Sequence, residues 1–287
     1  MSGGDGADDD TTLDGDTGAD GAGTDVFERA FEAIRVARDG GVATVTIDRP
    51  EDRNALNATV RAELKAALPE VEASDARVIV LTGSAECNAF VAGADVTELR
   101  ERGLVEQRAA SARPRVYEVV DGLTTPVIAA INGHALGGGL ELATACDIRI
   151  AKRDGKLGQP EINLGLIPGG GGTQRLPRLI GEGQAMRLIL SGELVDADEA
   201  DDIGLVEEVC DPDAFEERVG ELAGAIAEKS PLALEFAKES VRAASRTGLD
   251  EGIDFEAQLF VQLFATDDKN EGIDAFFEDR EPEWQGR

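Results

Sequence analysis

Short runs of β-branched and apolar residues recur along the middle of this 287-residue chain, separated by helical stretches and glycine-rich turns. The apolar runs predict buried strands over Val42–Ile47, 77–82, 127–131 and 147–151, and helical spacing predicts helices over 57–73 and 139–145. Strands that alternate with helices pack as a layered α/β core. No linker rich in Pro, Gly and Ser interrupts this pattern, so we expect one core over residues 26–212.

The chain becomes helical from Asp213 onward. Apolar residues at i, i+3 and i+4 spacing predict helices over 214–229, 231–245 and 250–265, and Pro231 suits the first position of a helix. We therefore expect a helical C-terminal region over 213–287. Its amphipathic stretch Ile253–Phe264 fits a subunit interface, although core packing explains the same periodicity.

Acidic residues dominate the charge, with 58 Asp and Glu against 28 Lys and Arg and a net charge of −30. Residues 1–25 contain many aspartates, no basic residue and little to bury, which predicts a disordered acidic tail. Such a surface repels itself in low salt, whereas molar salt shortens the screening length to about 3 Å. We interpret the bias as adaptation to a high-salt cytoplasm, with high solubility as the alternative. Nucleic acid is not expected as a partner, because phosphate binding needs clustered Lys and Arg.

The composition argues against several other classes of protein. No segment approaches the roughly 20 apolar residues of a spanning helix, and the N-terminus lacks the pattern of a signal peptide. We therefore expect a cytoplasmic protein without a membrane partner. The three cysteines lie far apart in the sequence, so we expect no disulfide framework. The chain has a single histidine, His134, and we expect no metal site.

Two glycine clusters resemble phosphate-binding turns without matching them. Gly137–Gly139 follows an apolar strand and opens a helix, but Leu142 occupies the place of the third glycine in a dinucleotide motif. Gly169–Gly172 lacks the Lys and Ser/Thr of a P-loop. Glycines at a strand-to-helix junction still expose backbone N–H groups. Such groups can stabilise a carbonyl oxygen that becomes negative.

A glutamate lies beside each of these turns. Glu141 is in the first turn of the helix that Gly137–Gly139 opens, and Glu161 follows Pro160 in a segment with apolar residues after it. Taken singly, each is better explained as a structural residue. Glu141 would favour the positive end of a helix dipole, and Glu161 would cap a turn.

Five ordered segments change this interpretation, since together they resemble the enoyl-CoA hydratase/isomerase (crotonase) family from about Phe31 to the C-terminus. The segments are Ile47–Asn57, Ala89–Val96, Pro126–Glu141, Leu157–Gly169 with Gly172–Arg175, and Phe264–Asp268 with Glu271–Phe276. The resemblance implies a crotonase-type spiral of ββα units. It also implies a C-terminal helical region that packs against neighbouring subunits in a homotrimer or hexamer.

The resemblance also implies a set of site residues. Glu141 and Glu161 correspond to the catalytic pair, with Glu141 activating water and Glu161 giving a proton to Cα, or with one proton shared between them. The backbone N–H groups of Ala94 and Gly138 correspond to the oxyanion hole. Coenzyme A, which is part of the substrate and not a separate cofactor, would lie along a set of residues from three loops: Ala55, Ala92, Asp95, Val96, Thr97 and Gly169.

The activity implied by the resemblance is hydration of trans-2-enoyl-CoA to 3-hydroxyacyl-CoA, as in fatty-acid β-oxidation. Both glutamates are present, which favours a hydratase. An enoyl-CoA isomerase or another crotonase chemistry is the alternative, and a non-catalytic RNA-binding relative is a third reading that the acidic composition disfavours. The sequence leaves the acyl chain length and the product stereochemistry open.

Overall fold

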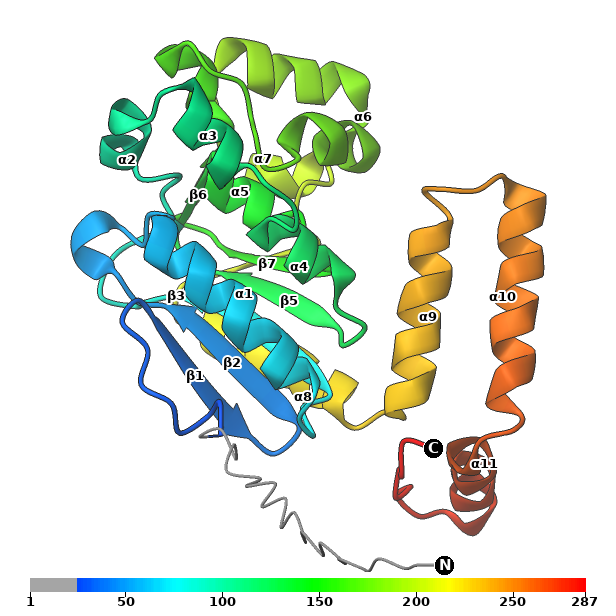
Figure 1. Ribbon diagram of the computed structural model, residues 1–287. Helices are drawn as coiled ribbons and strands as arrows, with labels where there is room; N and C mark the ends of the chain where they lie inside the picture. Colours follow the sequence, from blue (N-terminus) through cyan, green and yellow to red (C-terminus); the bar gives the residue numbers. More distant parts are fainter. Residues whose placement is uncertain (1–24) are drawn as a thin grey trace, which may run out of the picture.

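The computed structural model describes residues 25–287, which form two β-sheets surrounded by helices (Figure 1). The predicted acidic tail, apart from Asp25, lies outside the described residues. The larger sheet has the strand order β1-β2-β3-β5-β7-β10 and is parallel except for the β1–β2 pair. Its strands are β1 (Ile34–Asp39), β2 (Val42–Ile47), β3 (Val78–Gly83), β5 (Val127–Ile131), β7 (Ile148–Lys152) and β10 (Glu208–Cys210).

Alternate residues of the large sheet enter two separate hydrophobic clusters, because successive side chains of a strand point to opposite faces. On β3, Ile79 and Leu81 join the main core, whereas Val78 and Val80 join a smaller cluster with Phe215. The four predicted strands are confirmed to within one residue at each end.

A second sheet consists of four strands of three residues each, in the order β4-β6-β8-β9. Its members are β4 (Ala89–Val91), β6 (His134–Leu136), β8 (Lys156–Gly158) and β9 (Leu194–Asp196). The first three run parallel to one another, and β9 is antiparallel to β8. Such short strands give no clear periodicity, and the sequence did not predict them.

Helices cover both faces of the large sheet (Figure 1). Helix α1 (Ala58–Glu72) begins where Asn57 accepts a hydrogen bond from the amide of Val60, as an N-cap does. It packs beside α4 (Val116–Gly122) over the main core, and α8 (Phe215–Ala227) covers the opposite face. The remaining core elements are η1 (Pro50–Asp52), α2 (Val96–Glu101), α3 (Leu104–Ala110), α5 (Gly138–Ala143), η2 (Pro160–Leu164), α6 (Gly172–Ser191) and α7 (Ala197–Asp202).

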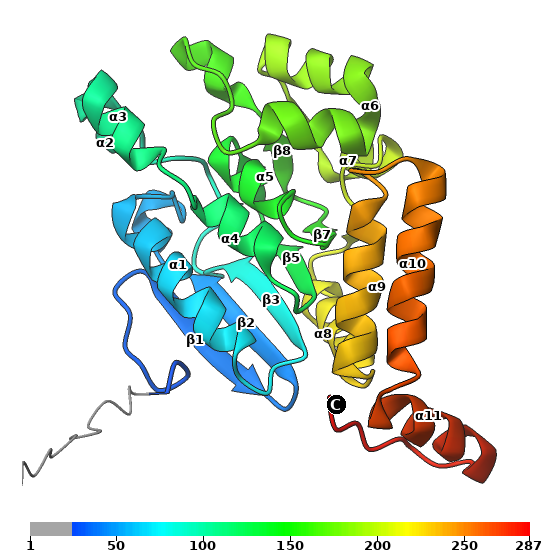
Figure 2. The same cartoon turned by 45° about the vertical axis from the view of Figure 1, so that its right-hand side comes forward.

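The last three helices lie at one side of this core (Figure 2). They are α9 (Pro231–Ala243), α10 (Leu249–Leu263) and α11 (Asp267–Glu278), with α9 and α10 side by side and α11 beyond them. Helix α9 contacts the core through ion pairs from Lys238 and Arg242 to Asp147, at 2.7 and 2.8 Å. The expected boundary at residue 213 falls just before α8, which packs against the large sheet. The helices outside the core begin at Pro231.

Candidate active site

Three parallel strands of the small sheet end at the predicted site. Ala94 follows β4, Gly138 and Glu141 follow β6, and Glu161 follows β8. Parallel strands place their carboxyl ends along one edge of a sheet, which is where α/β folds commonly build their sites. The pairing of β4 with β6 and of β6 with β8 therefore brings residues from positions 94 to 161 together.

Gly137 forms the junction between β6 and α5. Its φ of 49° lies in the left-handed region, which favours glycine. A methyl group built on its α-carbon would also lie 3.0 Å from Oε1 of Glu161. The absence of a side chain at position 137 thus lets Glu161 approach the N-terminus of α5.

Glu141 is 2% exposed, and one of its oxygens is held by the glycine-rich turn before α6. Oε1 accepts hydrogen bonds from the amides of Gly170, at 2.6 Å, and Gly172, at 2.8 Å. Burial raises the pKa of Glu141, and the amides of Gly170 to Gly172 oppose that rise. The hydrogen bonds fix the orientation of the carboxyl group and stabilise its ionised form.

Glu161 lies in η2 and is half-buried. Burial, together with the nearby charge of Glu141, raises its pKa to about 7. The side chain of Gln159 is fully buried beside it, and with its amide nitrogen facing Glu161 it donates to both carboxylate oxygens, at 2.9 and 3.1 Å. Both carboxyl groups therefore have raised pKa values, and the pKa of Glu161 lets it exist in either protonation state at neutral pH.

The amides of Ala94 and Gly138 lie next to each other. A methyl group on Gly138 would be 3.6 Å from the nitrogen of Ala94. In the β-bridge between Leu56 and Ala94, the amide of Leu56 donates to the carbonyl of Gly93 and the amide of Asp95 donates to the carbonyl of Leu56. The amide of Ala94 takes no part in these two hydrogen bonds. Gly138 is the first residue of α5, where helix N–H groups have no partner within the helix. Both donors are thus available to a ligand oxygen.

The sequence matches a known protein family over most of its length. The model of the family described as enoyl-CoA hydratase/isomerase matches residues 37–287. The chain belongs to this family. Its crotonase fold is also that of solved relatives: enoyl-CoA hydratase from Bacillus anthracis has 40% identity and a TM-score of 0.86, and covers 89% of this chain and 100% of its own.

Curated relatives of this hydratase/isomerase span nearly the whole chain. A crotonyl-CoA hydratase of Syntrophomonas wolfei is 41% identical over 253 residues, which cover 88% of this chain and 97% of the relative. A 2,3-dehydroadipyl-CoA hydratase of Escherichia coli is 40% identical, covering 88% and 98%. The two relatives carry different acyl groups in their names, so similarity alone does not define the acyl specificity of this chain.

The residues predicted to line coenzyme A lie on two connected loops and one turn. The amide of Ala92 donates to the carbonyl of Arg53, two residues before Ala55. Asp95 caps α2 and pairs with Arg49 at 3.7 Å, so its carboxylate has structural partners. Val96 and Thr97 begin α2, with Val96 exposed. Gly169 accepts a hydrogen bond from Arg115, and its contact with substrate stays a prediction.

The site contains residues that the sequence did not single out. Gly170 and Gly172 hold Glu141, Gln159 contacts Glu161, and the buried Tyr117 lies against both Gly138 and Gly170. The two glycines could have been suspected from their cluster. Nothing in the helical pattern around Tyr117 distinguishes it from a core residue.

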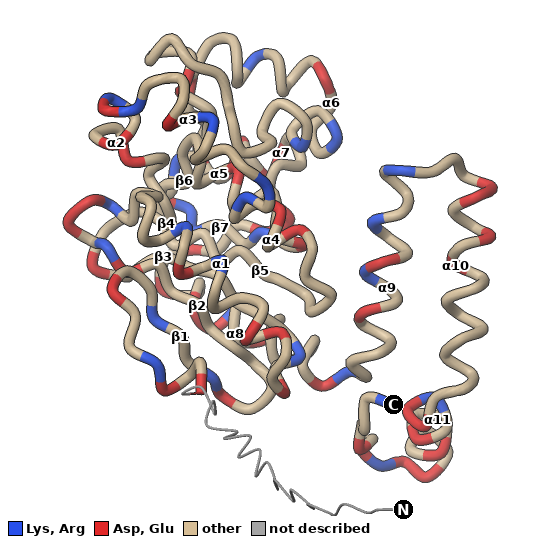
Figure 3. The backbone as a smooth tube through the Cα atoms, viewed as in Figure 1, with Lys and Arg blue, Asp and Glu red and all other residues tan. Residues whose placement is uncertain are grey.

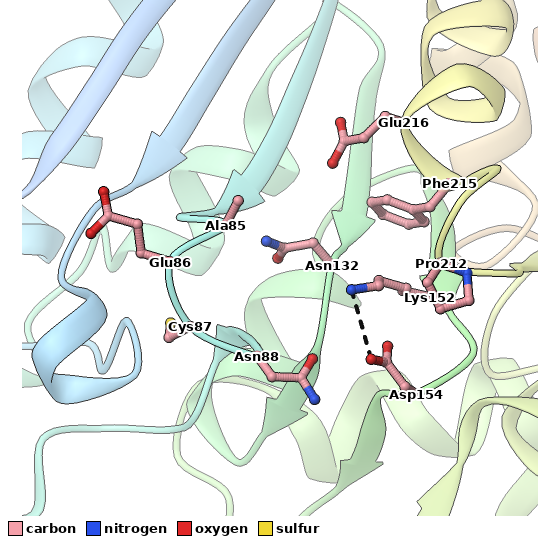
Figure 4. Close-up of a pocket in the computed structure, with 10 residues that line it drawn as sticks. All are labelled: Ala85, Glu86, Cys87, Asn88, Asn132, Lys152, Asp154, Pro212, Phe215 and Glu216. Atoms are coloured by element: carbon pink, nitrogen blue, oxygen red, sulfur yellow. Dashed lines mark ion pairs between the residues drawn. The ribbon is translucent and has the colours of Figure 1, made fainter.

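A separate polar hollow of about 350 Å³ lies at the carboxyl ends of the large sheet (Figure 4). It is lined by Lys152 at the end of β7 and by residues that follow β3, β5, β7 and β10, including Asn132 and Asp154, and by none of the predicted site residues. Lys152 and Asp154 pair there at 3.7 Å.

Within residues 25–287, no three His, Cys, Asp or Glu side chains are grouped to hold a metal ion, and no helix is long and apolar enough to cross a membrane. The sole histidine, His134, accepts a hydrogen bond from the amide of Lys156.

Proposed function

We propose that this chain hydrates trans-2-enoyl-CoA thioesters to 3-hydroxyacyl-CoA. The observation that carries the proposal is the position of two glutamates, Glu141 and Glu161, beside two unpaired backbone donors, those of Ala94 and Gly138. A thioester oxygen bound by both amides would become negative as water adds to the double bond. Rigid donors that face a developing charge are a strong source of catalysis.

The reaction follows from the states of the two carboxyl groups. Glu141 takes a proton from water while the water oxygen bonds to Cβ, and the electrons of the C=C bond move to the thioester oxygen. The enolate then collapses as Glu161 gives its proton to Cα. One water has been added, and transfer of the proton from Glu141 to Glu161 restores the starting state.

These roles agree with the surroundings of each group. Backbone amides hold Glu141 in a fixed orientation and favour its ionised form, as a base for water requires. The pKa of Glu161, raised to about 7, leaves it partly protonated at neutral pH, as an acid requires. The two groups are coupled, so their ionisations belong to the pair.

The test is hydration of crotonyl-CoA by the wild type and by Glu141→Gln and Glu161→Gln, with the exposed Glu182→Gln as the matched control. We expect each site variant to lose at least ~100-fold in kcat, in keeping with the loss of a positioned acid or base. Near wild-type hydration by either site variant would refute the roles. A trans-3-enoyl-CoA substrate, assayed in parallel for a shift of the double bond, measures the competing isomerase activity.

A series of acyl-CoA substrates would define specificity. Relatives of this chain are named crotonyl-CoA, short-chain enoyl-CoA and 2,3-dehydroadipyl-CoA hydratases. We therefore propose testing trans-2-enoyl-CoA from four carbons upward, together with one ω-carboxylated substrate. The acyl length with the highest kcat/KM identifies the substrate class.

We also propose that the chain forms a trimer, or a hexamer of paired trimers, through its last three helices. Support comes from large apolar side chains on α10, at its C-cap and on α11 that are more than half exposed, namely Leu249, Ile253, Phe260, Val261, Phe264, Phe276 and Phe277. Large exposed apolar side chains that gather on neighbouring helices are typical of subunit interfaces. Sedimentation equilibrium measures the assembly, and a monomer at micromolar concentration would contradict the proposal.

A high-salt cytoplasm is proposed as the setting of this enzyme. Acidic and basic side chains occur along the whole described backbone, and the acidic ones are not confined to one segment (Figure 3). A net charge of −30 favours a solvent in which self-repulsion is screened. Activity measured against KCl concentration tests this setting.

A further inference from the structure

Tyr117, the only tyrosine of the chain, extends from α4 into the candidate site and is 7% exposed. A methyl group built on Gly138 would lie 3.0 Å from the hydroxyl oxygen of Tyr117 and 3.6 Å from the nitrogen of Ala94. The hydroxyl and the amide of Ala94 are therefore on the same side of Gly138. This places a side-chain donor next to the two backbone donors.

The ring of Tyr117 also borders Glu141. The position that a methyl group on Gly170 would occupy is 2.4 Å from Cζ of Tyr117 and 2.7 Å from Oε2 of Glu141. Oε2 is the oxygen of Glu141 that does not accept from Gly170 or Gly172. The ring of Tyr117 and Oε2 of Glu141 are thus both close to Gly170.

Arg61 determines which way the hydroxyl can donate. Arg61, on α1, lies close enough to the phenolic oxygen for its positive charge to oppose the rise in the pKa of Tyr117, and its guanidinium is paired with Glu98 at 3.5 Å. An arginine only donates, so the phenolic oxygen can only accept from Arg61. The hydroxyl hydrogen of Tyr117 is then free to donate to a different atom.

The hydroxyl also keeps its proton throughout the working pH range. Burial, with a further contribution from the negative charge of Glu141, raises the pKa of Tyr117 above its ordinary value. A phenol in this place donates a hydrogen bond and does not act as a base.

We propose that the Tyr117 hydroxyl is a third donor to the thioester oxygen of the substrate, beside the amides of Ala94 and Gly138, and that Arg61 is its positioning residue. The inference rests on the proposed function for the identity of the substrate. The phenol remains protonated throughout, so no proton is transferred and only a hydrogen bond is made. This bond strengthens as the oxygen becomes an enolate, so it lowers the barrier more than it tightens binding.

The first experiment compares steady-state hydration of crotonyl-CoA by the wild type, Tyr117→Phe and Arg61→Met. Removal of one donor from an oxyanion hole typically costs about 10²–10³ in kcat. With two amides remaining, we expect Tyr117→Phe to lose about ten- to a hundredfold in kcat with little change in KM, and Arg61→Met to lose less. The matched control is Arg35→Met, at an exposed arginine of β1. Wild-type kcat in Tyr117→Phe would overturn the proposal.

The second experiment measures the bound enolate directly. Acetoacetyl-CoA is a thioester that forms an enolate with near-ultraviolet absorbance, and a site that stabilises the enolate lowers its apparent pKa. We expect that apparent pKa to rise in Tyr117→Phe, with an unchanged melting temperature. An unchanged enolate titration in this variant would refute the inference.

This second measurement requires no addition of water, so it separates the two proposals. Enolate binding that depends on Tyr117, in a protein without hydratase activity, would refute the proposed function and retain the third donor. Full hydratase activity with no effect of Tyr117→Phe on either measurement would retain the proposed function and refute the third donor.

Discussion

The amide of Gly170 donates a 2.6 Å hydrogen bond to Oε1 of Glu141, a carboxylate 29 positions earlier in the chain. The bond joins the turn before α6 to the first turn of α5. One oxygen of the carboxylate is thereby fixed, and the other lies close to Gly170, as does the ring of Tyr117. Orientation of the proposed base thus depends on the backbone of a distant turn as well as on its own helix.

Gly170→Ala tests this dependence. The new methyl group would lie 2.3 Å from Cε2 of Tyr117 and 2.7 Å from Oε2 of Glu141, so one or both must move while the amide at position 170 is retained. A displacement of about 1 Å within an active site can cost roughly 10²-fold. We expect kcat/KM for crotonyl-CoA to fall by about that factor.

Gly220→Ala serves as the control for Gly170→Ala. Gly220 lies within α8, is exposed, and has no atom within 4 Å of the position of the new methyl group. Alanine is favoured over glycine in a helix interior by about 1 kcal/mol, so this variant should unfold at a slightly higher temperature with unchanged kinetics. Equal activity of both variants would show that Glu141 does not need its observed orientation.

The pH dependence of hydration follows from the raised pKa of Glu161. The reaction needs one proton on the pair formed by Glu141 and Glu161, and that proton is lost as pH rises through about 7. We expect kcat/KM to fall about tenfold per pH unit above this value. The fall should be the same for dehydration, because the overall reaction neither takes up nor releases a proton.

The same shift affects folding stability. The folded-state pKa of Glu161 lies above the ordinary value of 4.5, so its contribution to stability is greatest below pH 4.5 and is lost as pH rises to about 7. Glu161→Gln removes this buried ionisation. The variant should gain melting temperature relative to the wild type at pH 8 and much less at pH 5, while losing activity at both. Parallel stability profiles for the two proteins would contradict the raised pKa.

Sequence patterns predicted the large sheet well and the site poorly. The run Val127–Ile131 is a strand in the structure because five apolar, largely β-branched residues are buried on both faces. The strands β4, β6 and β8 position the site, yet each has three residues, too few to show a period. Contacts such as that of Glu141 with Gly170 depend on how distant segments pack. Only resemblance to a family connected Glu141 with Glu161 from sequence.

Tyr117 provides its own spectroscopic signal, since the chain has no other tyrosine. Burial and the charge of Glu141 raise its pKa, so the folded protein should show no tyrosinate absorbance near 295 nm at pH 10, where free tyrosine is about half ionised. Unfolding in denaturant at that pH should produce the signal at once. Substitution by Glu141→Gln removes one cause of the shift and should lower the pKa of Tyr117. A tyrosinate signal in the folded wild type at pH 10 would contradict the buried position of the hydroxyl.

Salt should stabilise this protein beyond what a neutral homologue gains. With a net charge of −30 at pH 7, like charges on the folded surface repel at low ionic strength, and screening shortens the range of that repulsion from about 10 Å at 0.1 M to about 3 Å at 1 M. We expect the melting temperature to rise steeply between 0.1 and 2 M KCl. Repeating the measurement at pH 5 separates screening of charge from a general salting-out effect. Protonation of carboxylates at pH 5 reduces the net charge, so the melting temperature should then depend less on KCl concentration. The sign is decisive, since a melting temperature that falls with KCl would mean that the ion pairs on the surface outweigh its net repulsion.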